Sequence, residues 1–270
     1  MRPDPVLDAV LRSGVTLPAP SRSIGRLQAA AASDRSGPRE LAAIASTDPV
    51  LVGLLTRVAN TPVFHHHGPL RSLVDVIAML GGTKTIAIAV GAALQGRGSG
   101  VDPRLADAIW ARSVEVAGWS LRIAHRLRDA RRADLAFMTG LVHDAGLCAL
   151  LRRFPAHVAE FRRSMTFDFD QAAIALDRAS GGDHAAIGCI VARNWKLPPI
   201  VAEAVRVHHA PDLTTQDTAE SADAVVIAAY VAAGRRLVAG ATPDWDAWRD
   251  KASEIAGVDD ALLDALVAPG

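Results

Sequence analysis

The sequence predicts an all-α protein, and three observations support this fold class. Nearly every apolar segment repeats at the three- and four-residue spacing of an amphipathic helix. Several segments open on a capping residue followed by proline, and no hairpin signal separates them. Half of the 270 residues are hydrophobic but only 4% are aromatic. A core of closely packed helices with small side chains is therefore expected.

The first part of the chain contains five predicted helical segments. Asp48 is the expected N-cap of one helix, with Pro49 in its first position, and Ser72 is the expected cap of a later one. The last segment is rich in β-branched residues, but its length and its alanine and glycine content favour a buried helix. The predicted segments are residues 21–33, 37–47, 48–60, 72–80 and 82–94.

A glycine-rich stretch, QGRGSGVDP, occupies residues 95–103 and predicts a loop. We place a subdomain boundary there, with residues 1–95 as an N-terminal helical subdomain and residues 103–270 as a second helical bundle. In the second part, one helix over residues 132–154 is expected to be bent or interrupted near Gly140 or Gly146. The other predicted helices cover residues 105–127, 169–179, 183–195, 198–209, 222–237 and 259–268.

Composition limits the classes of function. Lys+Arg and Asp+Glu each number 29, so the net charge is zero and nucleic-acid binding is not favoured. The N-terminus, MRPDPVLDAV, lacks the apolar core of a signal peptide. Apolar runs such as TIAIAVGAAL fall short of the ~20 residues that span a bilayer. We therefore expect a cytoplasmic protein with no membrane segment.

Two pairs of side chains are assigned to packing. Cys148 and Cys189 lie in apolar helical surroundings with no Cys-x-x-Cys pair, so both are expected to be buried thiols. Trp245 and Trp248 lie three residues apart on one predicted helical face. They are expected either to pack the C-terminal segment onto the bundle or to form part of a partner surface.

Ordered motifs over most of the chain resemble one family. The acidic-Pro helix start leads to Arg57, Ala59 and Asn60, and a Ser-Leu element with Ile77, Leu80 and Gly81 follows. GLVHDAGL at residues 140–147 and Trp-x-Leu-Pro at residues 195–198 come later in the expected order. Over roughly residues 17–235 the chain resembles the HDOD family, the HD-related output domains of bacterial signalling proteins.

The resemblance implies an HD-phosphohydrolase-like helical bundle that is degenerate, with a helical N-terminal subdomain packed on it. In HD enzymes, a histidine, a His-Asp dyad and a distal aspartate hold the catalytic metal. His143 and Asp144 match the dyad, but Arg112 stands at the expected position of the first histidine and Ala229 near that of the distal aspartate. Arginine has no lone pair to offer and stays protonated. No catalytic residue is therefore assigned.

Three interpretations of the dyad stay open. The first is a structural polar network in which Arg112 neutralises Asp144. The second is a residual, non-catalytic divalent-metal site; imidazole and carboxylate are suitable ligands. The third is a working hydrolase. The residues that could form such a metal site are His143, Asp144, His184, His208 and His209.

The function expected from this resemblance is regulatory. We predict a non-catalytic bacterial signalling adaptor without a cofactor, acting through protein partners, with the cleft between its subdomains available to a small ligand. The alternative is a metal-dependent phosphohydrolase or cyclic-nucleotide phosphodiesterase that uses His143 and Asp144. The Gly-Tyr-Pro signature of cyclic-di-GMP phosphodiesterases is absent, since Ala210 and Pro211 follow His209. A transcriptional regulator is a third, less favoured interpretation.

Overall fold

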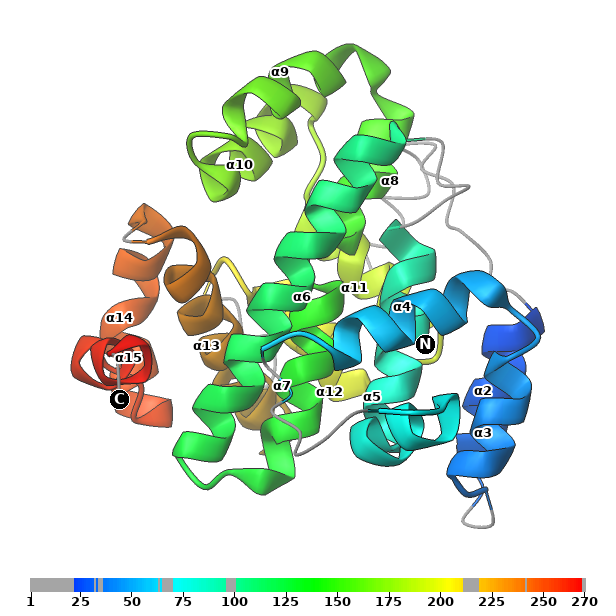
Figure 1. Ribbon diagram of the computed structural model, residues 1–270. Helices are drawn as coiled ribbons and strands as arrows, with labels where there is room; N and C mark the ends of the chain where they lie inside the picture. The colour runs from blue at the N-terminus through cyan, green and yellow to red at the C-terminus, as the bar shows by residue number, and fades with distance from the viewer. Residues whose placement is uncertain are drawn as a thin grey trace.

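The computed structural model describes residues 22–31, 33, 36–62, 64, 70–95, 101–210, 219–240 and 242–268. All regular structure in these ranges is helical and none is a strand, as the sequence predicts (Figure 1). The predicted loop at 95–103 falls largely outside the described residues, so the subdomain boundary stays a prediction.

The N-terminal part is built from four described helices with the predicted starts. Asp48 accepts hydrogen bonds from the backbone N–H groups of Val50 and Leu51, and the Ser72 hydroxyl accepts one from Asp75. These caps satisfy donors that a helix start leaves unpaired. The helices are α2 (Arg22–Ala31), α3 (Pro38–Ala45), α4 (Pro49–Ala59) and α5 (Leu73–Gln95).

Helix α5 joins the two segments that the sequence predicts separately. Gly81 interrupts it with a φ of 77°, in the left-handed region that favours glycine. Beyond this kink, Ile88 and Val90 are fully buried, as predicted for the alanine-rich segment. Helix α5 packs against α2, α3 and α4, and it also contacts the helices that follow the loop.

The second part packs around a long helix, α6 (Pro103–Arg126), with α7 (Ala130–Val142) and α13 (Ala219–Ala239) against it. Figure 1 shows α9 and α10 at the top of the view and α14 with α15 on the left, across the molecule from α2 and α3. The remaining elements are α8 (Ala145–Arg153), η1 (Pro155–His157), α9 (Val158–Ser164), α10 (Phe169–Ser180), α11 (His184–Asn194), α12 (Pro199–Val207), α14 (Pro243–Ala256) and α15 (Asp260–Val267).

The predicted interruption of the 132–154 helix is confirmed. The helix breaks at neither Gly140 nor Gly146 but between them, because α7 ends at Val142 and α8 begins at Ala145. His143 and Asp144 form the turn between the two helices. The dyad therefore does not lie within one continuous helix, and the turn brings both side chains toward α6.

The two tryptophans of α14 pack inward. Trp245 and Trp248 are buried, and the Trp248 indole donates a hydrogen bond to the His208 backbone carbonyl at 2.9 Å. Of the two predicted roles, packing onto the bundle is therefore the correct one. Cys148 and Cys189 are buried free thiols, as predicted.

Two apolar stretches are longer than the runs considered from the sequence. Leu73–Leu94 and Ala130–Arg153 are long and apolar enough to cross a membrane, but 44% and 89% of their most apolar windows are buried within the fold. The second stretch is also divided by the turn at His143 and Asp144. Core helices share this composition, so the stretches are weak evidence for a membrane span.

Candidate metal centre and buried ion-pair network

Arg112 projects from α6 into the centre of the second bundle, where it meets two carboxylates. Its Nη1 atom lies 3.0 Å from Asp144 Oδ2, and its Nη2 atom lies 2.5 Å from Asp170 Oδ1. The guanidinium also stacks 4.1 Å from the centroid of the Phe169 ring. All three charged side chains are at most 8% exposed. The pair expected between Arg112 and Asp144 is thus part of a larger buried network.

His143 faces this arginine. Its Nε2 atom lies 3.0 Å from Asp144 Oδ2 and 3.3 Å from Arg112 Nη1, while its Nδ1 atom lies 2.8 Å from the Gly140 carbonyl oxygen. Burial alone would raise the pKa of Asp144, but the adjacent His143 ring and the Arg112 guanidinium hold it well below its usual value. Asp144 is therefore a carboxylate throughout the neutral range.

A second buried arginine continues the network. Arg235 of α13 contacts Asp170 Oδ1 through Nη2 at 3.0 Å and Asp244 Oδ2 through Nη1 at 2.9 Å. Arg235 Nη1 also donates to the His208 backbone carbonyl at 3.1 Å. Burial would raise the pKa of Asp170, but Arg235 and Arg112 lower it. In this network two guanidiniums meet three carboxylates.

Three histidines converge on the other oxygen of Asp144. Asp144 Oδ1 lies 3.8 Å from His184 Nε2 and 3.9 Å from His208 Nε2. His184 Nε2 lies 3.0 Å from His209 Nε2. One ligand atom from each of these four residues lies within 4.8 Å of the others. Four of the five predicted residues are therefore gathered as potential metal ligands, while His143 faces Arg112 instead.

Hydrogen bonds on the far side of each ring set the tautomers. His184 Nδ1 lies 2.6 Å from an Asp177 carboxylate oxygen, and His209 Nδ1 lies 2.6 Å from Asp244 Oδ1. His208 Nδ1 lies 2.6 Å from the Val205 carbonyl oxygen. Each of these oxygens accepts a hydrogen bond, so Nδ1 is assigned as the protonated nitrogen and Nε2 of the neutral ring carries a lone pair. Arg235 Nη2 also lies 3.1 Å from His209 Nδ1, but the shorter carboxylate contact decides the tautomer.

This arrangement leaves unpaired acceptors facing one another. His208 Nε2 is buried and has no hydrogen-bond partner among the described residues. Burial and the adjacent charged groups hold the pKa values of His208 and His209 well below the usual range, so both rings are neutral. Burial also acts to lower the pKa of His184, but Asp177 raises it. Either a proton shared between His184 and His209 or a cation between the rings would satisfy the lone pairs.

The donor set fits a divalent cation. Three imidazole nitrogens and one carboxylate oxygen are ligands that zinc and related first-row metals accept. Carboxylates or a carbonyl orient each ring from behind, as in established metal sites. The residues that would hold the ion are Asp144, His184, His208 and His209.

Sequence reasoning missed Asp170, Arg235, Asp177 and Asp244. Asp170 lies in the first turn of α10 behind Asp168, whose side chain caps that helix and accounts for the acidic start. Arg235 lies more than a turn beyond Ala229, the position compared with the distal aspartate. Arg112 contacts both Asp144 and Asp170, but no local sequence pattern identifies Asp170 as its second acid.

The fold and this centre define an all-α protein with an HD-like bundle. A family model for the HDOD domain matches residues 17–211. The chain therefore belongs to the HDOD family, a family of signalling domains. A search of curated proteins finds no match.

Solved structures share the fold. An HDOD domain protein of unknown function from Geobacter sulfurreducens is 22% identical, with a TM-score of 0.64 over 97% of this chain and 92% of that one. A candidate metal-dependent phosphohydrolase from Shewanella amazonensis is 19% identical, with a TM-score of 0.62 over 97% and 94%. A candidate signal transduction protein from Marinobacter aquaeolei is 20% identical, with a TM-score of 0.66 over 95% of this chain and 57% of that one.

Proposed function

We propose that this HDOD protein is a signalling adaptor whose HD-like centre does no hydrolytic chemistry and whose output is contact with protein partners. The observation that carries the proposal is the Arg112 guanidinium, bonded to Asp144 at 3.0 Å and lying 3.3 Å from His143. A hydrolytic metal must share the dyad with further ligands and keep an open position for water. Here the Arg112 guanidinium occupies the position beside His143 and Asp144 Oδ2 where such a metal would lie.

Electrostatics support the same conclusion. A guanidinium cannot give up its proton at any pH the protein meets, so on the Oδ2 side of Asp144 it offers no lone pair to a metal and repels one. Its two carboxylate contacts hold it in place with directional, charge-assisted hydrogen bonds. A signalling role for the candidate signal transduction protein from Marinobacter aquaeolei fits this proposal.

The first prediction concerns the His143–Asp144 dyad, both in the purified protein and in the cell. We expect the purified protein to hydrolyse neither a generic phosphodiester nor a cyclic dinucleotide with added Mn²⁺, Fe²⁺ or Zn²⁺. We also expect a chain carrying His143→Gln to restore the transcript profile of a deletion strain, because output does not depend on turnover. Turnover that His143→Gln abolishes, with circular dichroism showing a folded variant, would overturn the proposal.

We further propose that the quartet of Asp144, His184, His208 and His209 holds one divalent cation without catalysing a reaction. The observation in its favour is the buried His208 Nε2 lone pair, together with the two Nε2 atoms of His184 and His209 only 3.0 Å apart. Two nitrogens bound at about 2.1 Å to one ion lie roughly this far apart. A bound ion would stabilise the fold in proportion to its affinity.

The second prediction tests this cation with Co²⁺, whose visible absorption reports its ligand geometry. Tag-free protein should bind one equivalent at the quartet, and His209→Gln should abolish the signal, because three ligands then remain. His209 is the most exposed quartet member, with a side chain 14% exposed, so its replacement disturbs packing least. The chain also carries three consecutive histidines at residues 65–67, and His66→Gln is the matched control. Loss of the signal in His66→Gln but not in His209→Gln would contradict the assignment.

A further inference from the structure

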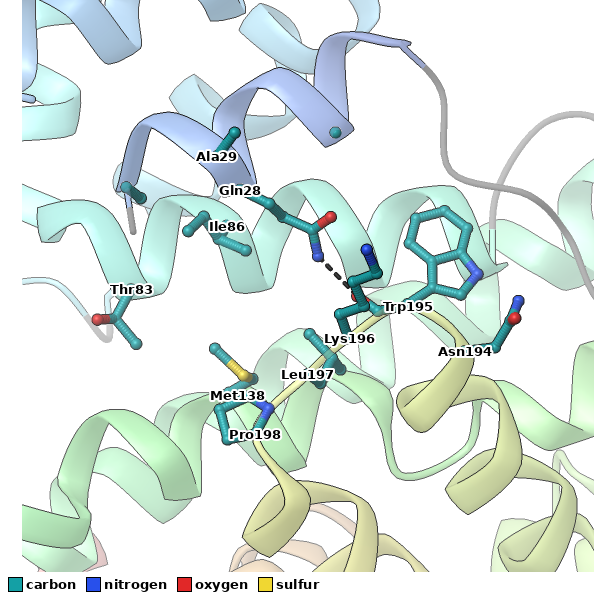
Figure 2. Close-up of a pocket in the computed structure, with 12 residues that line it drawn as sticks. Gln28, Ala29, Thr83, Ile86, Met138, Asn194, Trp195, Lys196, Leu197 and Pro198 are labelled. Atoms are coloured by element: carbon teal, nitrogen blue, oxygen red, sulfur yellow. Dashed lines mark hydrogen bonds between the residues drawn. The ribbon is translucent and has the colours of Figure 1, made fainter. Parts of the chain in front are cut away.

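A pocket separate from the histidine centre lies between the N-terminal helices and the second bundle. Its volume is about 580 Å³. Helix α2 and helix α5 form one side, and Met138 of α7 and the connection from α11 to α12 form the other (Figure 2). This size is typical of pockets that bind small molecules.

The walls of the pocket are mainly apolar. Ile86, Met138 and Leu197 lie around its interior in Figure 2. Gln28 crosses from α2 and donates its amide N–H to the Trp195 backbone carbonyl at 2.7 Å, tying the two sides together. An occupant would therefore bury an apolar body and touch both parts of the molecule.

Lys196 is the one charged residue among those lining the pocket. Its side chain is exposed, and no carboxylate pairs with it in the part of the chain that the structure describes. It stands next to the Trp195 carbonyl that Gln28 contacts. The pocket thus combines an apolar interior with a single unneutralised positive charge.

The backbone at Lys196 is strained. Its φ is 55°, in the left-handed region that residues other than glycine and asparagine rarely adopt. The Leu197 N–H bonds to the Ala192 carbonyl and the Lys196 N–H to the Arg193 carbonyl, both at 3.0 Å. This is the Schellman pattern that ends helices, in which glycine usually takes the left-handed position. A lysine here carries a conformational cost that glycine would avoid, and such strain often accompanies function.

We propose that this pocket binds a small amphipathic monoanion, an organic carboxylate with an apolar body. The apolar body lies among Ile86, Met138 and Leu197, and the carboxylate meets the Lys196 ammonium at the edge. One lysine, without a second cation or a nest of backbone N–H groups, suits a single negative charge better than a phosphate. The site needs neither the metal nor the absence of catalysis argued above.

Three probes with the same tail and different heads test the class of ligand. Decanoate, decanol and decyltrimethylammonium are titrated below their micelle concentrations, with binding followed by calorimetry. Decanoate should bind about fivefold more tightly than decanol, as expected for one exposed ion pair, and the cation should bind most weakly. Equal affinity for all three heads, or no binding of decanoate, would overturn the proposal.

Variants locate the binding. A Cβ added at Gly25, which lines the pocket from α2, meets no atom within 4 Å, so Gly25→Leu introduces a side chain at the pocket wall without a clash at its Cβ. It should weaken decanoate binding by at least about tenfold while the fold is kept, since leucine is a better helix former than glycine. Lys196→Gln should bring decanoate down to the affinity of decanol, and Lys251→Gln on α14 is the matched control. Decanoate affinity that is unchanged in both Gly25→Leu and Lys196→Gln would refute the site.

The variant Lys196→Gly separates the backbone strain at this position from the contribution of the lysine to ligand binding. Relief of the left-handed strain should raise the melting temperature by about 2–4 °C, while decanoate affinity falls as in Lys196→Gln. A more stable variant that binds decanoate as well as the wild type would show that the lysine serves no ligand, and the proposal would fail.

Discussion

Replacing Arg112 with alanine is expected to lower the free energy of unfolding by about 3–5 kcal/mol, the cost of removing one partner from a buried ion pair. Asp144 and Asp170 are both 2% exposed and would lose the guanidinium that contacts each of them. Asp170 would keep Arg235, but Asp144 would keep only histidines. Urea denaturation followed by circular dichroism measures the change.

The surface offers a matched control for this substitution. Arg163 pairs with Glu160 on α9, but its side chain is 73% exposed, so Arg163→Ala should change stability by no more than about 0.5 kcal/mol. The contrast isolates burial, because both substitutions remove the same side chain from a helix.

A double variant then identifies which carboxylate carries the cost. Asp144→Asn in the Arg112→Ala background removes the buried charge that has lost its partner. The loss in free energy of unfolding of the double variant should therefore be smaller than the sum of the two single losses by more than about 1 kcal/mol. Strict additivity would mean that water or a bound ion compensates Asp144, and the buried network would not be the source of stability. The same cycle with Asp170→Asn should show weaker coupling, since Arg235 stays.

The sequence was sufficient for the fold because helix signals are local. Asp48 before Pro49 caps α4, and the alanine-rich run ending at Leu94 is buried, each as its own residues predict. The family resemblance also followed from residues close together in the chain. Arg112 could be paired with Asp144 in advance because the motif order places both near one expected metal position.

Contacts between residues far apart in the chain could not be predicted from the sequence. Asp170 meets Arg112 across 58 residues and Arg235 across 65, and nothing in either local pattern specifies the partner. The sequence placed the turn at His143 and Asp144 only to within a few residues, because the two glycines nearby are the stronger helix breakers by composition. Gly140 and Gly146 instead lie within helices, where they permit close approach to a neighbouring backbone.

Gly146→Ala is the second large effect expected, and it links the dyad to packing. A Cβ at this position would lie 2.0 Å from the His184 backbone oxygen and 2.9 Å from the Gly188 nitrogen. Both atoms are backbone, so α8 and α11 must separate rather than a side chain rotate. Overpacking of this kind costs typically 1–3 kcal/mol, and we expect about 3 kcal/mol here.

Two other glycines provide a graded comparison. At Gly188 the nearest obstacle is the Val205 side chain at 2.9 Å, so Gly188→Ala should cost less, about 1 kcal/mol. At Gly53, exposed on α4, a Cβ meets nothing within 4 Å, and Gly53→Ala should stabilise by about 0.5–1 kcal/mol. Urea midpoints for the three variants give the order directly.

The same series separates stability from the metal centre. His184 supplies the backbone oxygen that the new methyl group would strike, and its ring is one of the four candidate ligands. Gly146→Ala should therefore weaken Co²⁺ binding at the quartet, whereas Gly53→Ala should leave it unchanged. If Gly146→Ala unfolds at a lower urea concentration but binds Co²⁺ like the wild type, the contact between α8 and α11 would serve packing alone. The glycine after the dyad would then have no part in placing His184 opposite Asp144.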